Sequence, residues 1–211
     1  MLIKSVMKTE VLTVSPEVTI NQAWEILRDL EIRHLPVVED NQLVGIVSDR
    51  NLLAASPAMS KIIKDPALLN RSVGEIMSAP VITVHPLDTI DDAASLMYKY
   101  KIGSLPVVSG EGIVGIITES DLLRALTEMM GAQEPGSQLL IRMEDRPGIL
   151  AEITQIFKRF EVNIISVLTI PNNVPETRDM AFKINTINPR KIVTALMEAG
   201  FEVIGPHFGG E

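Results

Sequence analysis

The chain has 211 residues, of which 22% are charged and 46% are hydrophobic, and its formal net charge is −8. The apolar content excludes a disordered chain, the length allows one large domain or two small ones, and the acidic balance argues against a nucleic-acid backbone as the main partner. The absence of cysteine excludes disulfides and thiolate nucleophiles, and we predict no metal site, since only His34, His85 and His207 remain.

The first elements predict a unit of strand, helix, two strands and helix. Residues 11–14 form an apolar run that ends before a proline, which predicts a short strand. Thr19 is a good N-cap for a helix whose apolar residues recur at helical spacing up to Leu30. Two further apolar runs, 35–38 and 43–47, flank a polar turn and predict a hairpin, after which a second helix begins near Asp49.

The same unit recurs 70 residues later. This shift places Met7 on Met77 and the run 35–38 on 105–108, and no gap is needed. The match predicts two copies of one unit, at residues 1–55 and 73–130. The linker between them, 56–72, is expected to carry some helix around 59–64.

A different pattern follows a second linker at 131–136, which is rich in Gly, Pro and polar residues. Residues 139–143, 163–171, 179–186 and 201–204 predict strands, and Ile149 to Phe160 mark an amphipathic helix. Asn188 is the expected N-cap of a second helix, with Pro189 at the first helical position and Gly200 just past the helix end. The order βαββαβ over 137–207 is the ferredoxin-like arrangement, so the fold class is mixed α/β (α+β).

Residues 32–38 with 45–52, and 102–108 with 115–122, resemble the CBS domain, and two copies in tandem resemble a Bateman module. The resemblance implies that a Gly-apolar-apolar-Thr/Ser-x-x-Asp stretch holds the ribose of an adenine nucleotide. Thr118 and Asp121 match this pattern in copy two, whereas copy one has Ser48 and Asn51. For the adenine, the resemblance implies Val81, Ile82, Thr83, Ile102 and Pro106 in copy two, and Val11, Leu12, Thr13, Ile32 and Pro36 in copy one.

The chemistry of a ribose fits this assignment. Its two adjacent hydroxyl groups can both donate to one ionised carboxylate, and Asn51 lacks that charge, so we expect the weaker site in copy one. Arg33, His34 and Arg50 are candidate contacts for a phosphate. The alternative remains that both Ser/Thr-x-x-Asn/Asp stretches only cap their helices, and that His34 and Arg50 only face water.

The third unit resembles an ACT domain, on the segments Asp145-Arg146-Pro147-Gly148-Ile149-Leu150 and Val162-Asn163-Ile164. The resemblance implies that the loop and the helix start bind a free amino acid at an interface of paired domains. A helix N-terminus with a glycine is a suitable carboxylate receptor, and Asn163 would add a hydrogen bond. The alternative is that the turn only begins the helix and the domain only dimerises.

Two CBS copies followed by one ACT domain, with the strings His85-Pro86-Leu87-Asp88, Pro135-Gly136-Ser137-Gln138 and Ser166-Val167-Leu168, resemble regulators of acetoin utilisation. The resemblance implies a non-enzymatic cytoplasmic homodimer that senses AMP, ADP or ATP as a regulatory ligand and acts on a partner enzyme. No residues remain for a catalytic domain, no basic recognition helix indicates a transcription factor, and no apolar run is long enough to cross a membrane. The alternative is a structural dimerisation protein with closed pockets.

Overall fold

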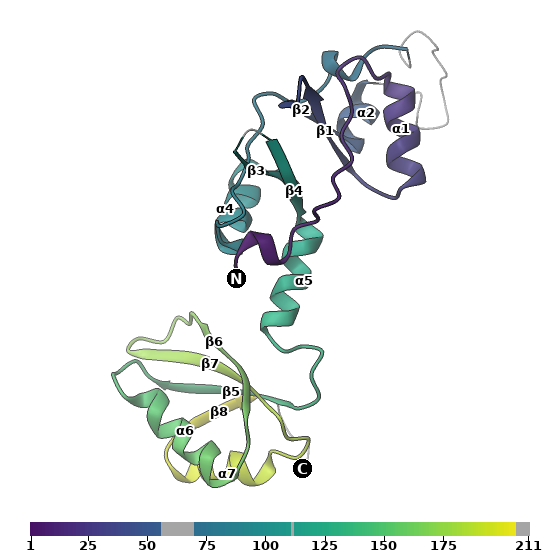
Figure 1. Ribbon diagram of the computed structural model, residues 1–211. Coiled ribbons are helices and arrows are strands. Elements are labelled where there is room, and N and C mark those ends of the chain that lie inside the picture. The colour runs from purple at the N-terminus through teal and green to yellow at the C-terminus, as the bar shows by residue number, and fades with distance from the viewer. Residues whose placement is uncertain (56–69, 111, 206–211) are drawn as a thin grey trace. The chain divides into compact units, whose positions relative to one another are not determined.

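The computed structural model describes residues 1–55, 70–110 and 112–205, and the chain forms two compact units, residues 1–123 and 124–211 (Figure 1). The expected helix around 59–64 lies outside the described residues, and the domain boundaries drawn from the sequence stay predictions. The first unit contains the predicted repeat. Its elements are α1 (Ile20–Asp29), β1 (His34–Glu39), β2 (Gln42–Ser48) and α2 (Asp49–Ala55), then α4 (Ile90–Tyr100), β3 (Ser104–Ser109) and β4 (Gly112–Thr118). Helix α5 (Glu119–Met129) begins in this unit and continues past Leu123 into the second.

Local sequence signals explain the helices and hairpins of this unit. Thr19 caps α1 in a capping box with Gln22, as predicted, and Thr89 does the same for α4 with Asp92. The β1–β2 hairpin is also confirmed. Its turn places Asp40 and Asn41 at φ of 48° and 64°, values that these two residue types tolerate and that a two-residue hairpin turn requires.

The two copies exchange the segments that precede them. The short helix η1 (Ile3–Ser5) lies beside copy two, where the Ile3 amide donates to the carbonyl of Asp88 at 2.9 Å (Figure 1). Its counterpart η3 (Val73–Glu75) lies on copy one, where the Val73 amide donates to the carbonyl of Val18 at 2.8 Å. Each segment then pairs with the opposite hairpin, Lys8 with Ile116 and Ser78 with Ile46. Each of these contacts therefore recurs 70 residues on in the other half.

A methionine and a glycine fix each exchanged segment. A Cβ atom on Gly45 would lie 2.2 Å from the sulfur of Met77, and one on Gly115 would lie 2.6 Å from the sulfur of Met7. Only glycine leaves room for the methionine side chain at these two strand positions. This contact explains why Met7, Met77, Gly45 and Gly115 all recur in the repeat.

The predicted strand at 11–14 is wrong in extent. Only Val14 forms a bridge, parallel to Val37, and the copy-two equivalent is a bridge of Val84 to Val107. Between Lys8, which pairs with copy two, and Val14, which pairs with copy one, the chain crosses from one hairpin to the other. Residues 10–13 are not paired with a strand, because they span the space between the copies.

The second unit is a four-stranded antiparallel sheet with two helices. Its elements are β5 (Ser137–Glu144), α6 (Ile149–Arg159), β6 (Ile164–Ile170), β7 (Thr177–Ile184), α7 (Arg190–Glu198) and β8 (Glu202–Gly205). The strand order β6-β7-β5-β8 confirms the ferredoxin-like arrangement. The expected N-cap Asn188 is wrong by one residue. Pro189 is the N-cap, because the Asn188 side chain only reaches the Arg190 amide, at 3.4 Å, and Gly200 follows the helix with φ of 91°.

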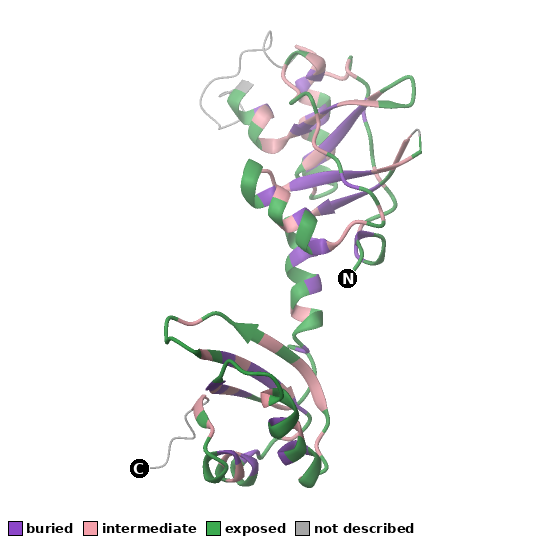
Figure 2. Cartoon of the chain, turned by 90° about the vertical axis from the view of Figure 1, so that its left-hand side faces the viewer, coloured by how far each residue is buried: buried purple, intermediate pink, exposed green. Residues whose placement is uncertain are grey.

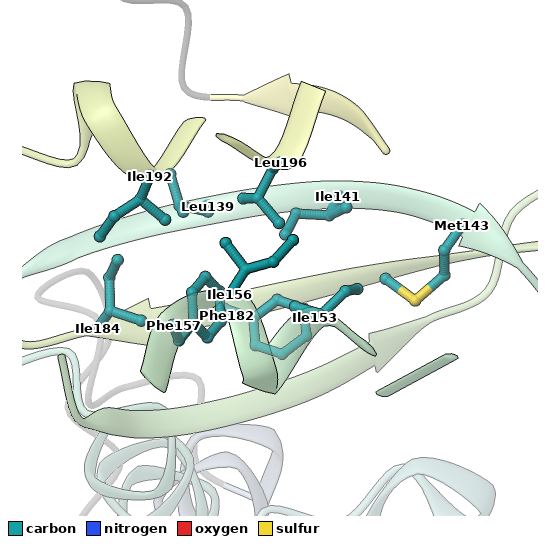
Figure 3. Close-up of a cluster of buried hydrophobic side chains, with 10 residues drawn as sticks. All are labelled: Leu139, Ile141, Met143, Ile153, Ile156, Phe157, Phe182, Ile184, Ile192 and Leu196. Carbon is teal, nitrogen blue, oxygen red and sulfur yellow. The ribbon is translucent and has the colours of Figure 1, made fainter. Parts of the chain in front are cut away.

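The core of this unit lies between the sheet and the helices. Alternate residues of β5 point toward α6 and α7. Figure 2 shows buried residues in purple on the sheet and on both helices. Figure 3 shows Leu139, Ile141 and Met143 in this layer, with Ile192 and Leu196 above them. The rings of Phe157 and Phe182 meet edge to face, with centroids 5.3 Å apart, which is a favourable aromatic geometry.

The opposite face of the sheet carries a polar pair. Asp179 is buried, and Arg142 on the neighbouring strand donates to both of its carboxylate oxygens, at 2.9 and 3.2 Å. The amide of Asn172 donates to the same carboxylate at 2.8 Å. The hydrogen bonds from Arg142, aided by that from Asn172, lower the pKa of Asp179, although burial opposes the shift.

The packing of Met77 on Gly45 yields a stability prediction. Gly45→Val should lower the free energy of unfolding of the first unit by about 1–3 kcal/mol, since the added side chain overlaps Met77. Trp24, the only tryptophan of the chain, packs against the copy-one core and reports this unfolding by fluorescence. Gly112→Val is the control, because a Cβ there meets no atom within 4 Å. Equal stability of the two variants would contradict the role of Gly45, and Met77→Ala should partly rescue Gly45→Val.

The lowered pKa of Asp179 yields a pH prediction. A carboxylate whose folded-state pKa lies below the unfolded value, about 3.9, contributes stability above that value and loses it as the pH falls through the folded pKa. Between about pH 5 and pH 3, the wild-type β7 strand should lose more protection from amide hydrogen exchange than that of Asp179→Asn. Parallel losses in the two proteins would show that this carboxylate does not set the acid sensitivity.

Candidate functional site

Two hollows lie between the copies of the first unit, and the 70-residue shift relates them. The first, of about 270 Å³, is named the Ser48 pocket; the second, of about 400 Å³, is named the Thr118 pocket. Both volumes are near the lower end of the range typical of small-molecule sites. The Ser48 pocket is lined by Arg33, His34, Ile46, Ser48, Asp49, Arg50, Asn51, Ser78, Pro80, Val81, Ile82, Lys101, Ile102, Gly103, Ser104 and Glu119. The Thr118 pocket is lined by Lys8, Glu10, Val11, Leu12, Leu30, Glu31, Ile32, Arg33, His34, Pro36, Gly103, Ile116, Thr118, Glu119 and Ser120.

The hollows combine residues of both copies, and this corrects the predicted grouping. The sequence assigned Val81, Ile82 and Ile102 to the same site as Thr118, but they line the Ser48 pocket. Conversely, Val11, Leu12, Ile32 and Pro36 line the pocket of Thr118. The reason is the segment exchange: the chain before each copy crosses to the other hairpin, so its apolar residues face the other copy's helix start.

The start of α2 is closed by its own side chains. The Ser48 hydroxyl donates to Asn51 Oδ1 at 2.5 Å, the Ser48 amide donates to the same oxygen at 3.0 Å, and the Asn51 amide donates back to Ser48 Oγ at 3.2 Å. The Nδ2 of Asn51 also reaches the carbonyl of Ile76 at 3.5 Å and Ser78 Oγ at 3.4 Å. An aspartate offers no such donor, so Asn51 ties the exchanged segment to copy one.

The start of α5 repeats this arrangement with a carboxylate. The Thr118 hydroxyl and amide donate to Asp121 Oδ2 at 2.6 and 3.0 Å, and the Asp121 amide donates to Thr118 Oγ1 at 3.4 Å. Asp121 is only 4% exposed, and it is not among the residues that line the Thr118 pocket. Helix capping is therefore realised at both positions, and a ribose role for these residues stays a prediction.

Three predicted adenine contacts lie elsewhere. Thr13 and Thr83 line a larger hollow of about 1130 Å³ near the hairpin tips. Pro106 is buried in β3, where its carbonyl accepts the hydrogen bond of the Val84 amide at 3.1 Å. None of the three is among the lining residues of the Ser48 pocket or the Thr118 pocket.

His34 lies where the two pockets meet. It lines both, as do Arg33, Gly103 and Glu119. Burial lowers the pKa of His34, Asp49 and Glu119 oppose the shift, and the cations of Arg33 and Arg50 add to it. A Cβ on Gly103 would lie 3.2 Å from the imidazole Cε1, so the ring packs against the backbone of copy two.

Several lining residues escaped the sequence reasoning. Lys101 and Glu31 hold equivalent positions in the repeat, each just past a helix and with φ of 54° and 52°. Ser104, the equivalent of His34, is 4% exposed, and its Oγ has no hydrogen-bond partner in the part of the chain that the structure describes. Aligning the copies and noting where their polar residues differ would have pointed to these positions.

In the second unit, the predicted amino-acid contacts are divided between the two ends of α6. Arg146 donates to both carboxylate oxygens of Glu152, at 2.7 and 2.9 Å, and Asp145 pairs with Arg178 at 2.7 Å. The hydrogen bonds to Glu152 are the main cause that raises the pKa of Arg146. Gly148, with φ of 88°, is the N-cap of α6, and nothing lies within 4 Å of the place of its missing Cβ.

Pro147 and the first helical residues, Ile149 and Leu150, continue this loop, and Leu150 is 40% exposed. Asn163 follows the far end of α6, where its backbone amide donates to Asn185 Oδ1 at 2.8 Å. A helix of 11 residues separates the two groups by about 16 Å. Within one chain, therefore, Asn163 and the Gly148 loop lie too far apart to hold the same amino acid, and the predicted site at an interface of paired domains stays a prediction.

Among residues 1–55, 70–110 and 112–205, no helix has the length and hydropathy needed to cross a membrane. The same residues contain no group of three or more His, Cys, Asp or Glu side chains placed to hold a metal ion.

Known proteins match both units. The CBS domain family matches residues 3–58 and 73–128, and the ACT domain family matches 137–201. The CBS domain-containing protein YhcV of Bacillus subtilis is 31% identical over 137 residues, which are 65% of this chain and 91% of that protein. The inosine-5′-monophosphate dehydrogenase of Korarchaeum cryptofilum is 38% identical over 114 residues, but these are 54% of this chain and only 22% of the enzyme.

Solved structures resemble the CBS part. A putative acetoin utilization protein (AcuB) from Vibrio cholerae has a TM-score of 0.54 at 34% identity, covering 63% of this chain and 95% of its own. The CBS domain pair of protein MJ0100, in complex with 5′-methylthioadenosine and S-adenosyl-L-methionine, gives 0.53 at 30%, covering 64% and 98%. CBSX2 in complex with AMP gives 0.53 at 30%, covering 61% and 98%. With both halves of the repeat and the last third matched, the chain belongs to the CBS-domain proteins and carries an ACT domain after its CBS pair.

Proposed function

We propose that this protein is a non-enzymatic sensor that binds an adenosine ligand between its CBS copies and thereby regulates a partner enzyme. The observation that carries the proposal is the pair of equivalent hollows, each with apolar walls from one copy and a hydroxyl-capped helix start from the other. The relatives solved with AMP, 5′-methylthioadenosine and S-adenosylmethionine support it. A ligand that prefers one relative orientation of the copies shifts the population toward that orientation.

The likeness to the Vibrio cholerae protein supports a place in acetoin utilisation. We further propose a cytoplasmic homodimer, supported by apolar side chains exposed along the last helix of the CBS pair. Leu123 is 65% exposed and Leu126 is 47% exposed on α5, more than a solvated helix usually shows together. The competing function, a dimerisation protein with closed pockets, is supported by the caps that Asn51 and Asp121 already satisfy.

Titration calorimetry with adenosine, AMP, ADP, ATP and S-adenosylmethionine distinguishes these functions. We expect saturable binding of at least one ligand, abolished by Leu12→Trp combined with Ile82→Trp, because each indole fills one pocket. Leu87→Trp is the control, since Leu87 is 57% exposed outside both pockets. The absence of binding up to millimolar concentrations would contradict the sensor function and favour a dimerisation protein with closed pockets.

We also propose that the ACT domain binds a free amino acid between two protomers. The open space at Gly148 and the separation of Asn163 from it support a site that a second chain completes. In calorimetric melting, an amino acid should raise the transition temperature of the wild type, and Leu150→Asp and Asn163→Ala should each remove this response. If Leu150→Asp removes the response and Asn163→Ala does not, the site lies within one protomer. If none of the twenty amino acids raises the transition temperature of the wild type, the proposal is contradicted.

A further inference from the structure

The two pockets have the same architecture but opposite charge. Three cations and two carboxylates line the Ser48 pocket, namely Arg33, Arg50 and Lys101 against Asp49 and Glu119. Two cations and three carboxylates line the Thr118 pocket, namely Lys8 and Arg33 against Glu10, Glu31 and Glu119. Leaving His34 aside, since it lines both, the pockets differ by two unit charges.

The difference arises at equivalent positions of the repeat. Lys101 in the Ser48 pocket corresponds to Glu31 in the Thr118 pocket, and Arg50 corresponds to Ser120. Within the described residues, the side chains of Arg33, Arg50 and Lys101 form no ion pair with a carboxylate. Among the described residues, therefore, no carboxylate forms an ion pair that neutralises these three charges.

A buried hydroxyl adds a second observation at the Ser48 pocket. Ser104 lines it, is 4% exposed, and has an Oγ without a hydrogen-bond partner among the described residues. A buried polar atom is normally satisfied, so an unpaired one in a cavity wall indicates a ligand or water that completes it. The equivalent position of the Thr118 pocket is His34, which is larger and shared.

We propose that the pockets sort adenosine ligands by charge, the Ser48 pocket taking one with a phosphate and the Thr118 pocket an uncharged or cationic one. This rests on the proposed function, because it assigns ligand classes to the same two hollows. A phosphate dianion is attracted by the unpaired cations of the first pocket and repelled by the carboxylates of the second. From the sequence we expect the weaker site at Asn51; for a phosphorylated ligand the charge sorting predicts the reverse order, and the affinities of the two pockets decide between the two predictions.

Two matched single-pocket proteins test the sorting. Leu12 and Ile82 are equivalent residues on opposite walls, so Leu12→Trp leaves the Ser48 pocket open and Ile82→Trp leaves the Thr118 pocket open. AMP and adenosine are the probes, because they differ only in the phosphate. We expect Leu12→Trp to bind AMP roughly tenfold more tightly than adenosine at low salt, and Ile82→Trp to bind adenosine at least as tightly as AMP.

Exchanging the charges provides the decisive comparison. Glu31→Lys combined with Lys101→Glu keeps the net charge of the chain, and both positions have the same left-handed backbone, so the exchange adds no backbone strain. In each single-pocket protein, the exchange should move the AMP-to-adenosine ratio toward that of the other pocket. Raising the salt from about 0.05 to about 0.5 M should weaken AMP binding and leave adenosine binding unchanged.

The outcomes separate this inference from the proposed function. Equal AMP-to-adenosine ratios in the two single-pocket proteins, or ratios that the charge exchange leaves unchanged, would overturn the sorting while ligand binding stands. Failure of the wild type to bind either probe would overturn both. If circular dichroism shows that a Trp variant does not fold, Glu31→Lys with Lys101→Glu is introduced into the wild-type chain, in which both pockets are open. AMP should then shift the amide NMR signal of Ile82 in the wild type and that of Leu12 in the charge-exchanged protein. If AMP shifts the same residue in both proteins, the sorting is overturned.

Discussion

The exchange of segments between the two copies is the constraint on which the first unit depends. Each copy supplies a methionine that fits over a glycine of the other, and a short antiparallel pairing follows it. The chain must then cross back to its own hairpin, which leaves the crossing residues unpaired and places them between the copies. The pockets are a consequence of this crossing: their apolar walls are the crossing residues, and their polar ends are the helix starts they reach.

The sequence was sufficient for most of the fold because its signals are local. Thr19 and Thr89 cap helices through the residue three positions on, and the polar turn at Asp40 and Asn41 defines a hairpin whatever surrounds it. The ferredoxin-like order also follows from alternating local patterns. The wrong predictions concern features that depend on distant parts of the chain. The strand at 11–14 was expected from its apolar run, but whether such a run pairs depends on which hairpin lies beside it.

The candidate site shows the same division between local and distant information. The caps that Ser48 forms with Asn51, and Thr118 with Asp121, follow from a spacing of three residues that is visible in the sequence, while their role toward a ribose stays a prediction. The residues that face these helix starts across each pocket were not predicted. A repeat shows which residues of the two copies are equivalent, but not which residues of one copy contact the other. In the second unit, α6 separates the loop before it from Asn163, so the predicted amino-acid site needs a second chain, and the sequence of one chain does not show how two chains pair.

The caps also decide where the affinity for a ligand must come from. A ribose hydroxyl that bonds to Asp121 or Asn51 competes with the hydroxyl and amide that already donate to them. Such an exchange of one hydrogen bond for another contributes little net free energy, because one bond is lost for each bond gained. The remaining sources are burial of the base against the crossing residues, which both pockets offer alike, and the charge on the rest of the ligand, which they do not. In the function we propose, discrimination therefore falls to Lys101, Arg50 and Glu31, residues at which the copies differ, while the shared architecture gives both pockets the same apolar walls for a base.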